Sequence, residues 1–273
     1  MRALVLGGGG ITGIAWELGV LSGLRRAGTD LGKADLIVGT SAGAYVGTLL
    51  ATGVDLEEAV AGTADIEIEL SPRIDPTLLA QGFAVLSDHS LPPREIRARL
   101  GALARRAPVG EDGPHVARFA EQLPVHEWPR APRLIITAVD TATGDLAAWD
   151  ADAGIPLPAA VAASCALPGV FPPVRAGAGY YMDGGVRSVT NADLAEGADA
   201  VVVLAPTGGM FRASPASEIA ALGATRSLLI APDAAARSAI GGNILDPGRR
   251  GPALEAGVAQ ADAVAAAVAE AWA

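Results

Sequence analysis

The chain has 273 residues, of which 51% are hydrophobic and 18% are charged. This composition predicts a large buried core and excludes an intrinsically disordered chain. The net charge of −10, from 20 basic and 30 acidic residues, argues against a nucleic-acid partner and against electrostatic capture by an anionic membrane. Contact with a lipid surface is therefore expected to be transient, apolar and local.

The cysteine and histidine counts limit the chemistry further. The chain has a single cysteine, Cys165, which excludes an internal disulfide. One cysteine and three scattered histidines do not form a metal-ligand cluster, so no metal is expected. Glycines 7–10 interrupt the N-terminal apolar segment before it reaches the length of a signal-peptide core or a membrane span. We expect a cytoplasmic protein without an integral membrane segment.

Two consecutive strand-loop-helix units open the chain. They are expected as a strand at Ala3–Leu6, a helix at Ile11–Arg26, a strand at Leu36–Val38 and a helix at Ala44–Thr52. A glycine-rich turn joins strand to helix in each unit. Tandem units of this kind predict an α/β fold with a mostly parallel central sheet covered by helices.

The character of the chain changes at about residue 61. From there to residue 132, frequent prolines interrupt short helical pieces such as Arg94–Ala107. We interpret residues 61–132 as a helical cap segment over the sheet. Neither a linker nor an internal repeat marks a boundary, so residues 1–273 are expected to form a single domain.

The elements predicted beyond the cap are short. The expected strands are Leu134–Val139, Leu146–Trp149, Tyr180–Met182 and Ala200–Leu204, and the expected helices are Ala159–Ala166 and Ala253–Trp272. The first two strands, separated by the turn-forming residues 140–145, are typical of a hairpin. The last strand is a continuous apolar run, which is typical of a strand buried on both faces.

A Gly-x-Ser-x-Gly motif, residues 39–43, joins the second predicted strand to its helix. This is the layout of a nucleophile elbow, in which Ser41 is exposed on a sharp turn and the glycines allow close packing. The motif alone is weak evidence in a chain with 34 glycines. If Ser41 is a nucleophile, another group must accept its proton.

Histidine is not the expected proton acceptor. In an α/β-hydrolase the histidine follows the serine and the acid in chain order, whereas His89, His115 and His126 all lie in the predicted cap. We interpret all three as surface or cap-packing residues. A carboxylate that acts directly on Ser41 is the simplest alternative.

Asp183 is the leading candidate for that carboxylate. It follows the predicted strand Tyr180–Met182, and Gly184 and Gly185 behind it allow close approach to a facing backbone. Partial burial would raise its affinity for a proton. Read alone, the Asp-Gly-Gly sequence is typical of an ordinary tight turn.

The first glycine loop has three interpretations. Gly8-x-Gly10-x-x-Gly13 follows a strand and opens a helix, as a dinucleotide-binding fingerprint does. A dinucleotide-binding loop requires an acidic residue at the end of the next strand, Leu36–Val38, to bind a ribose hydroxyl. The nearby acidic residue, Asp35, lies at the beginning of that strand. The loop is otherwise an oxyanion hole, built from the N–H groups of Gly8, Gly9 and Gly10 at a helix N-terminus, or a bare structural turn.

Four motifs occur in order along nearly the whole chain. They are Gly8-Gly9-Gly10-Ile11-Thr12-Gly13, Gly39-Thr40-Ser41-Ala42-Gly43, Ala163-Ser164-Cys165-Ala166-Leu167-Pro168 with Phe171-Pro172, and Asp183-Gly184-Gly185-Val186. Together they resemble the patatin-like phospholipases. The resemblance implies a three-layer α/β fold, with Gly13, Gly39, Gly43, Gly184 and Gly185 as motif residues.

The same resemblance implies a set of roles. Ser41 is expected as the nucleophile, Asp183 as the general base, and Gly8, Gly9 and Gly10 as the oxyanion hole. The implied reaction is hydrolysis of phospholipids, lysophospholipids or related acyl esters without a metal or other cofactor. An acyltransferase that uses the same Ser41 acyl-enzyme and a nucleotide-binding Rossmann-type oxidoreductase are the alternatives.

Three residues stand apart from these roles. Thr12 occupies a position where the family often has a basic residue, and Asn191 is followed by Ala192 where the family commonly has Asn-x-Pro or Asn-Pro. No role is therefore assigned to Asn191. Cys165 is interpreted as a small buried residue within a helix.

An acyl chain would need an apolar trough, which we place beneath the segment Thr77–Arg99. Its apolar side chains cluster beside prolines: Leu78, Leu79, Phe83, Val85 and Leu86. The alternative is that these residues form the ordinary core of the cap.

Overall fold

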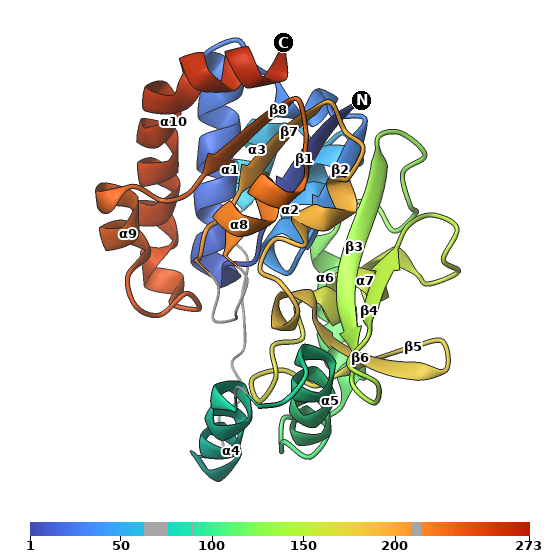
Figure 1. Cartoon of the computed structure of the whole chain (residues 1–273). Helices are drawn as coiled ribbons and strands as arrows, with labels where there is room; N and C mark the ends of the chain where they lie inside the picture. The colour runs from blue at the N-terminus through green and yellow to red at the C-terminus, as the bar shows by residue number, and fades with distance from the viewer. Residues whose placement is uncertain (63–75, 89, 209–213) are drawn as a thin grey trace.

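The computed structural model describes residues 1–62, 76–88, 90–208 and 214–273 (Figure 1). In this part of the chain, eight strands form one sheet in the order β5-β6-β3-β2-β1-β7-β8, with β4 paired to β3. The strands are β1 (Arg2–Leu6), β2 (Leu36–Gly39), β3 (Arg133–Asp140), β4 (Leu146–Trp149), β5 (Val174–Ala176), β6 (Gly179–Asp183), β7 (Ala200–Leu204) and β8 (Arg226–Ile230). The pairings among β3, β2, β1, β7 and β8 are parallel, and those of β4, β5 and β6 are antiparallel. The predicted, mostly parallel sheet is confirmed.

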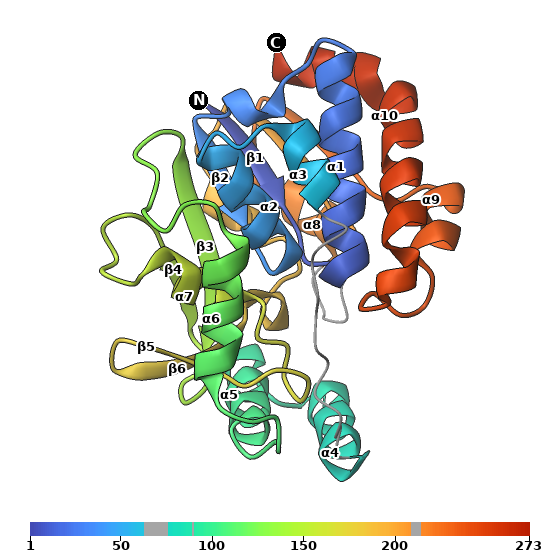
Figure 2. The ribbon, with the colours of Figure 1, turned by 180° about the vertical axis from the view of Figure 1, so that it is seen from behind.

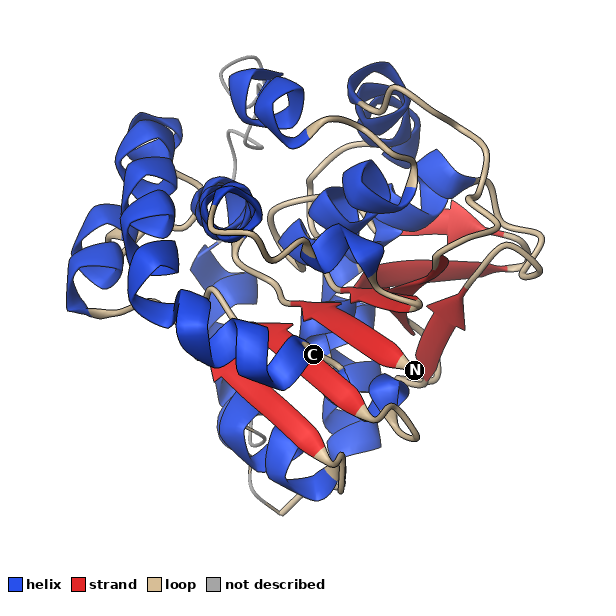
Figure 3. Ribbon diagram, turned by 90° about the horizontal axis from the view of Figure 1, so that it is seen from above, coloured by secondary structure: helices blue, strands red, loops and turns tan. Residues whose placement is uncertain are grey.

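Helices cover both faces of this sheet, which gives the predicted three layers (Figure 3). Those in the described residues are α1 (Gly10–Arg26), α2 (Ala42–Ala51), α3 (Leu56–Gly62), α4 (Pro76–Ser87), α5 (Pro93–Ala104), α6 (Asp112–Gln122), α7 (Leu157–Ser164), α8 (Pro215–Ala221), α9 (Ala234–Ile240) and α10 (Arg250–Trp272). One face carries α1, α2, α7 and α10. The other carries α8 and the 3-10 turn η4 (Ala192–Ala195).

Alternate residues of the central strands supply the two core layers. In β1, Leu4 and Leu6 belong to the larger apolar cluster with the helices of the first face, and Ala3 and Val5 belong to the cluster of the second face. Side chains that alternate along a strand reach both faces, so a strand covered on both sides reads as a continuous apolar run. This explains why β1 and β7 were recognisable from their sequences.

Helices α1 and α10 lie side by side at one edge of the molecule (Figures 1 and 2). Their backbones approach closely, because a Cβ at Gly19 would lie 2.3 Å from the Leu254 carbonyl oxygen and one at Gly257 would lie 2.4 Å from that of Trp16. The predicted C-terminal helix Ala253–Trp272 is confirmed and begins three residues earlier.

The remaining predictions agree with the structure in the first two strand-helix units, the hairpin of β3 and β4, helix α7 and strand β6. Strands β5 and β8 and helices α3, α6, α8 and α9 were not predicted. They are short, and β8 begins with exposed Arg226 and Ser227, so it lacks the apolar run of a central strand.

The described part of the predicted cap consists of α4, α5 and α6. Helix α5 packs on β3 and β6, and α6 packs on α7. In Figures 1 and 2, α4 and α5 lie beyond the β6 end of the sheet. Residues 63–75 and His89 lie outside the described part. The cap boundaries at about 61–132 and the single 1–273 domain stay predictions.

Candidate active site

Ser41 lies on a sharp turn between the end of β2 and the start of α2. Its φ of 53° and ψ of −115° lie where L-residues are rarely found. The flanking glycines are required by close packing: a Cβ at Gly43 would lie 2.1 Å from the Leu6 carbonyl oxygen, and one at Gly39 would lie 2.6 Å from that of Gly43. The Gly-x-Ser-x-Gly motif therefore forms a strained elbow.

The end of α7 holds the backbone of this elbow. The Ser41 N–H donates to the Ser164 Oγ at 2.9 Å, and the Cys165 Sγ donates to the Ser41 carbonyl oxygen at 3.3 Å. Cys165 differs from the prediction, since α7 ends at Ser164 and leaves Cys165 as a half-buried residue just beyond the helix. Its side chain donates to the elbow and also packs against the main apolar cluster.

Asp183 is buried beside Ser41, with only 4% of its surface exposed. The Gly185 N–H donates to its Oδ1 at 2.7 Å, and the Ser41 side chain is close enough to stabilise the ionised carboxylate. Burial raises the pKa of Asp183 to about 6, and the Gly185 N–H and the Ser41 side chain oppose this rise by stabilising the ionised form. The carboxyl group thus titrates close to neutral pH, where it can exchange a proton with a hydroxyl group.

Sheet topology explains how residues so distant in sequence meet. Strand β3 lies between β2 and β6; it pairs in parallel with β2, so that Gly39 lies opposite Ile136, and antiparallel with β6, so that Asp183 lies opposite Ala138. The elbow after Gly39 and the carboxylate of Asp183 are therefore at the same edge of the sheet. A loop at that edge completes the site.

The glycine loop after β1 supplies backbone donors. The Gly8 N–H already donates to the Val189 carbonyl oxygen at 2.8 Å, so Gly8 offers no free donor to a ligand. Within the described residues, the N–H groups of Gly9 and Gly10 have no protein acceptor. They lie at the N-terminus of α1, where the helix dipole adds positive potential. The N–H of Ala42 at the start of α2 is likewise unengaged within the described chain.

A cavity of about 590 Å³ opens on these groups. Ser41, Asp183, Gly8, Gly9 and Gly10 contribute to its wall. Most of the remaining lining is apolar and comes from several helices and loops: Ile14, Tyr45, Leu78, Phe83, Leu86, Leu100, Leu103, Phe119, Phe171, Ile244 and Leu245. The site therefore combines a polar centre with space for a long apolar group.

The segment expected to form an apolar trough contributes to this wall. Leu78, Phe83 and Leu86 of α4 line the cavity, and Phe83 is also 62% exposed on its outer side. Val85 instead packs against the apolar cluster that contains Leu100. The side chain of Leu79 lies outside the described part.

His115 lines the cavity without contacting the elbow. Its Nε2 lies 3.1 Å from the Ala162 carbonyl oxygen, and its ring stacks on Phe171 with centroids 4.9 Å apart. Burial lowers the pKa of His115 to about 4, so it is neutral at physiological pH. It packs as predicted. His126 is exposed and away from the cavity lining, and His89 is outside the described residues.

The described residues hold neither a metal-ligand cluster nor a helix able to span a membrane. No group of three or more His, Cys, Asp or Glu side chains is placed to hold a metal ion in this part of the chain. Across the same residues, every helix is too short or too polar to cross a lipid bilayer.

The sequence matches the family model of the patatin-like phospholipases over residues 4–196. This span contains the elbow, the glycine loop and Asp183. The chain belongs to the patatin-like phospholipase family. None of the curated proteins matches it significantly.

Solved structures resemble this patatin-like chain in fold. VipD from Legionella pneumophila has a TM-score of 0.50 at 14% identity, and the alignment covers 97% of this chain and 66% of VipD. The type III effector protein ExoU has a TM-score of 0.44 at 17% identity, with 96% of this chain and 52% of ExoU covered. This chain therefore spans less than two thirds of either protein.

Ser164 and Ala42 were not predicted as parts of this patatin-like site. Ser164 is a polar residue in an otherwise apolar helix, which is the signal that could have singled it out. Ala42 takes part through its backbone, so only the elbow geometry reveals it. Gly13 and Gly184 act by permitting close approach, to Pro206 and Thr137 respectively.

Proposed function

We propose that this chain is a serine acyl hydrolase of lipid esters, with Ser41 as nucleophile and Asp183 as general base. One observation supports this most: the Ser41 side chain interacts with a buried carboxylate whose pKa is raised to about 6, and both residues lie in the wall of an apolar cavity. A serine hydroxyl attacks well only when a neighbouring base removes its proton. The pair meets that requirement without histidine.

In the first half-reaction, the Ser41 Oγ forms a bond to the ester carbonyl carbon while Asp183 takes the hydroxyl proton. The carbonyl oxygen becomes an oxyanion, for which the free N–H groups of Gly9 and Gly10, with that of Ala42, are the available donors. Collapse of this intermediate breaks the bond to the leaving alcohol. Asp183 returns its proton to that alcohol, and the acyl group remains on Ser41.

In the second half-reaction, water replaces the alcohol. Asp183 takes a proton from the water as its oxygen attacks the acyl-enzyme, and a second oxyanion forms in the same place. When the bond to Ser41 breaks, the proton passes back to its Oγ and the carboxylic acid leaves. Asp183 therefore acts as base and then as acid in each half.

The lining of the cavity indicates the substrate class. Apolar walls favour the acyl chain of a phospholipid, lysophospholipid or related ester, because each buried methylene contributes about 0.8 kcal/mol. The charge of −10 favours a short apolar contact with a lipid aggregate over electrostatic capture. The cytoplasmic location expected from the sequence stays a prediction.

The nucleotide-binding alternative receives no support from the geometry. Its ribose-binding acid would have to lie at the carboxyl end of β2, but Asp35 precedes β2 and accepts a hydrogen bond from the Arg2 N–H at the opposite end of the sheet. Nothing in the site favours an acyltransferase over a hydrolase. Product analysis with a competing alcohol distinguishes the two.

Fluorophosphonate labelling with peptide mapping tests the proposal. We expect modification at Ser41 in the native chain, loss of labelling in Ser41→Ala, and strong loss in Asp183→Asn. Ser238→Ala, which removes an exposed hydroxyl on α9, is the matched control and should label normally. Label on another residue, or wild-type turnover of a short-chain aryl ester by Ser41→Ala, would refute the mechanism.

A further inference from the structure

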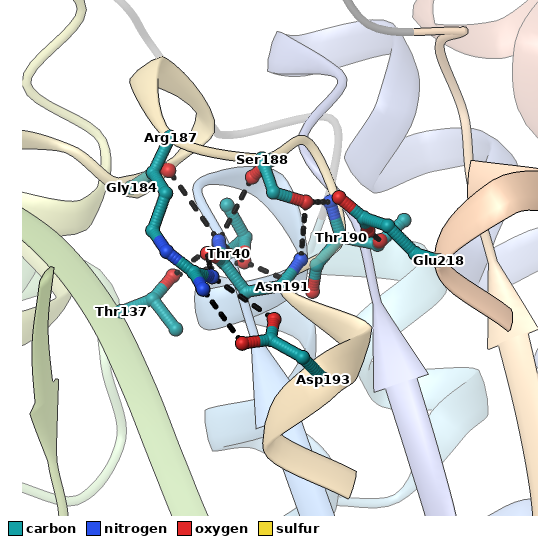
Figure 4. A network of polar contacts seen from close by, with 9 residues as sticks. All are labelled: Thr40, Thr137, Gly184, Arg187, Ser188, Thr190, Asn191, Asp193 and Glu218. Carbon is teal, nitrogen blue, oxygen red and sulfur yellow. Dashed lines mark hydrogen bonds and ion pairs between the residues drawn. The ribbon is translucent and has the colours of Figure 1, made fainter. Parts of the chain in front are cut away.

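Asn191 is fully buried in the loop that follows Asp183 (Figure 4). Its φ of 51° is in the left-handed region, which asparagine tolerates better than most residues. Its Nδ2, which carries two protons, is within hydrogen-bond distance of acceptors on four residues: the Thr40 Oγ1 at 3.0 Å, the Thr137 Oγ1 at 3.3 Å, the Gly184 carbonyl oxygen at 3.3 Å and the Ser188 carbonyl oxygen at 2.8 Å. A buried amide with this many partners is strongly fixed.

Two of these partners adjoin the reacting pair. Thr40 immediately precedes Ser41, and Gly184 immediately follows Asp183. The amide of Asn191 therefore connects the chain beside the nucleophile with the chain beside the base. It does so without contacting the side chain of either.

A second layer fixes the orientation of this amide. The Arg187 Nη1 donates to the Asn191 Oδ1 at 2.7 Å, and the same guanidinium forms two hydrogen bonds to the Asp193 carboxylate, at 2.9 and 2.6 Å (Figure 4). Arginine can only donate and the carbonyl oxygen of Gly184 can only accept, so the amide has one favourable orientation. Its NH₂ group faces Thr40 and Gly184.

The same loop also touches the glycine loop. The Val189 carbonyl oxygen accepts the Gly8 N–H at 2.8 Å, and the Thr190 hydroxyl is hydrogen-bonded to Glu218 of α8. Residues 188–191 thus contact Thr40 before the elbow, Gly184 after the proposed base and the glycine loop that offers backbone donors. A change in this loop would displace these parts relative to one another.

We propose that Asn191 is a positioning residue, which sets the distance and direction between Ser41 and Asp183 through its amide contacts with Thr40 and Gly184. This inference rests on the proposed Ser41 and Asp183 chemistry. Proton transfer depends on hydrogen-bond geometry, so a loosened pair reacts slowly even where the cavity still binds the ester normally. Loss of these contacts is therefore expected to lower kcat and to leave KM unchanged.

The main test replaces Asn191→Gly, which keeps the left-handed backbone and introduces no charge. On a short-chain aryl ester we expect kcat to fall about 10- to 100-fold, because displacing reacting groups by about 1 Å costs on the order of 100-fold, with KM within about twofold of wild type. Gln260→Ala is the control, since it removes a buried amide of α10 that bonds Trp16 and Ala231 and no residue of this loop. Its kcat should be unchanged.

A milder pair of variants keeps the test decisive if Asn191→Gly does not fold. Thr40→Val keeps the branched shape but removes the oxygen that faces Asn191, whereas Thr40→Ser keeps that oxygen. We expect reduced kcat at unchanged KM in the first and near-wild-type kcat in the second. Folded Asn191→Gly or Thr40→Val with wild-type kcat overturns the positioning role, provided Ser41→Ala is inactive. Full turnover by Ser41→Ala instead overturns the proposed function and this inference with it.

Discussion

The N–H of Ser41 donates to the Oγ of Ser164 at 2.9 Å, although the two residues are 123 positions apart. The amide of the proposed nucleophile is therefore engaged by α7 and is not a free donor. Backbone conformations with positive φ at a non-glycine residue persist only when the surroundings hold them. Ser164 supplies that support from a neighbouring element.

We predict that Ser164→Ala impairs both stability and catalysis. The variant leaves a partly buried N–H without its acceptor, so the free energy of unfolding should fall by about 1–3 kcal/mol. The elbow should also relax away from its strained conformation, which would lower kcat about tenfold. Denaturant unfolding and steady-state kinetics on a short-chain ester measure the two effects.

Ser22→Ala is the control for this variant. Ser22 is also a buried serine and hydrogen-bonds Glu57 at 2.9 Å, but it lies twelve residues beyond Gly10 along α1, about 18 Å from the glycine loop. It should lose stability and keep its kcat. Equal kcat in the two variants would show that Ser164 has no effect on the elbow.

Sequence patterns were sufficient for the parts of the site that are contiguous in the chain. The elbow around Ser41 and the Asp183 turn each place a candidate reactive side chain at or just beyond the end of a strand, and strand ends are recognisable from apolar runs. Gly8 shows where this approach stops. A glycine in the loop looks like a free donor in the sequence, but its N–H is engaged by Val189, which only the fold brings near.

Ser164 and Asn191 could not have been assigned for a related reason. Each acts through hydrogen bonds to a residue more than a hundred positions away, Ser41 and Thr40 respectively. Local periodicity carries no information on such contacts. A buried polar residue in an apolar segment indicates that a partner exists and does not identify it.

The pH dependence of turnover should follow the carboxyl group of Asp183. Its pKa is raised to about 6, and the base must be ionised to accept the Ser41 proton. We expect kcat/KM to be low and to rise about tenfold per pH unit below pH 6, then to level off above it. His126→Gln, which removes an exposed histidine, should leave the profile in place. A profile that moves with this variant would assign the titration to histidine.

The same raised pKa predicts a stability difference for Asp183→Asn. Between its ordinary value of 3.8 and about 6, the folded state binds more protons than the unfolded state, so wild-type stability falls as the pH rises through this window. The asparagine variant has no ionisable group at this position, so it does not lose this stability as the pH rises. It should be inactive, similar to wild type in stability at pH 4, and more stable at pH 7 by on the order of 1–3 kcal/mol. Thermal unfolding of both proteins at pH 4 and pH 7 measures the stability difference. The same difference at both pH values would contradict the raised pKa.

Gly43→Ala should disrupt the elbow by steric contact alone. The added Cβ would lie 2.1 Å from the Leu6 carbonyl oxygen, so α2 and β1 must separate. We expect more than about 2 kcal/mol of destabilisation and loss of esterase activity. Gly113→Ala is matched to it, because Gly113 lies near the start of α6 with nothing within 4 Å of its added Cβ. That variant should be neutral or slightly stabilising. Similar unfolding midpoints for the two would exclude the close approach at Gly43.

The preference for acyl-chain length should change when a larger side chain is placed on the cavity side of α5, and not when it is placed on the exposed side. Leu103 lines the cavity, whereas the adjacent Ala102 is exposed and outside the lining. Leu103→Trp places an indole ring in the part of the cavity proposed to hold the acyl chain. We expect kcat/KM for a long-chain ester to fall about tenfold or more, and kcat/KM for a short-chain ester to change much less. Loss of about two buried methylenes is sufficient for such a change. Ala102→Trp adds the same ring on the outer face and should leave the ratio of long-chain to short-chain activity unchanged. Because both variants lie on one helix turn, a ratio that shifts equally in the two would reflect movement of α5 and would refute acyl binding beside Leu103.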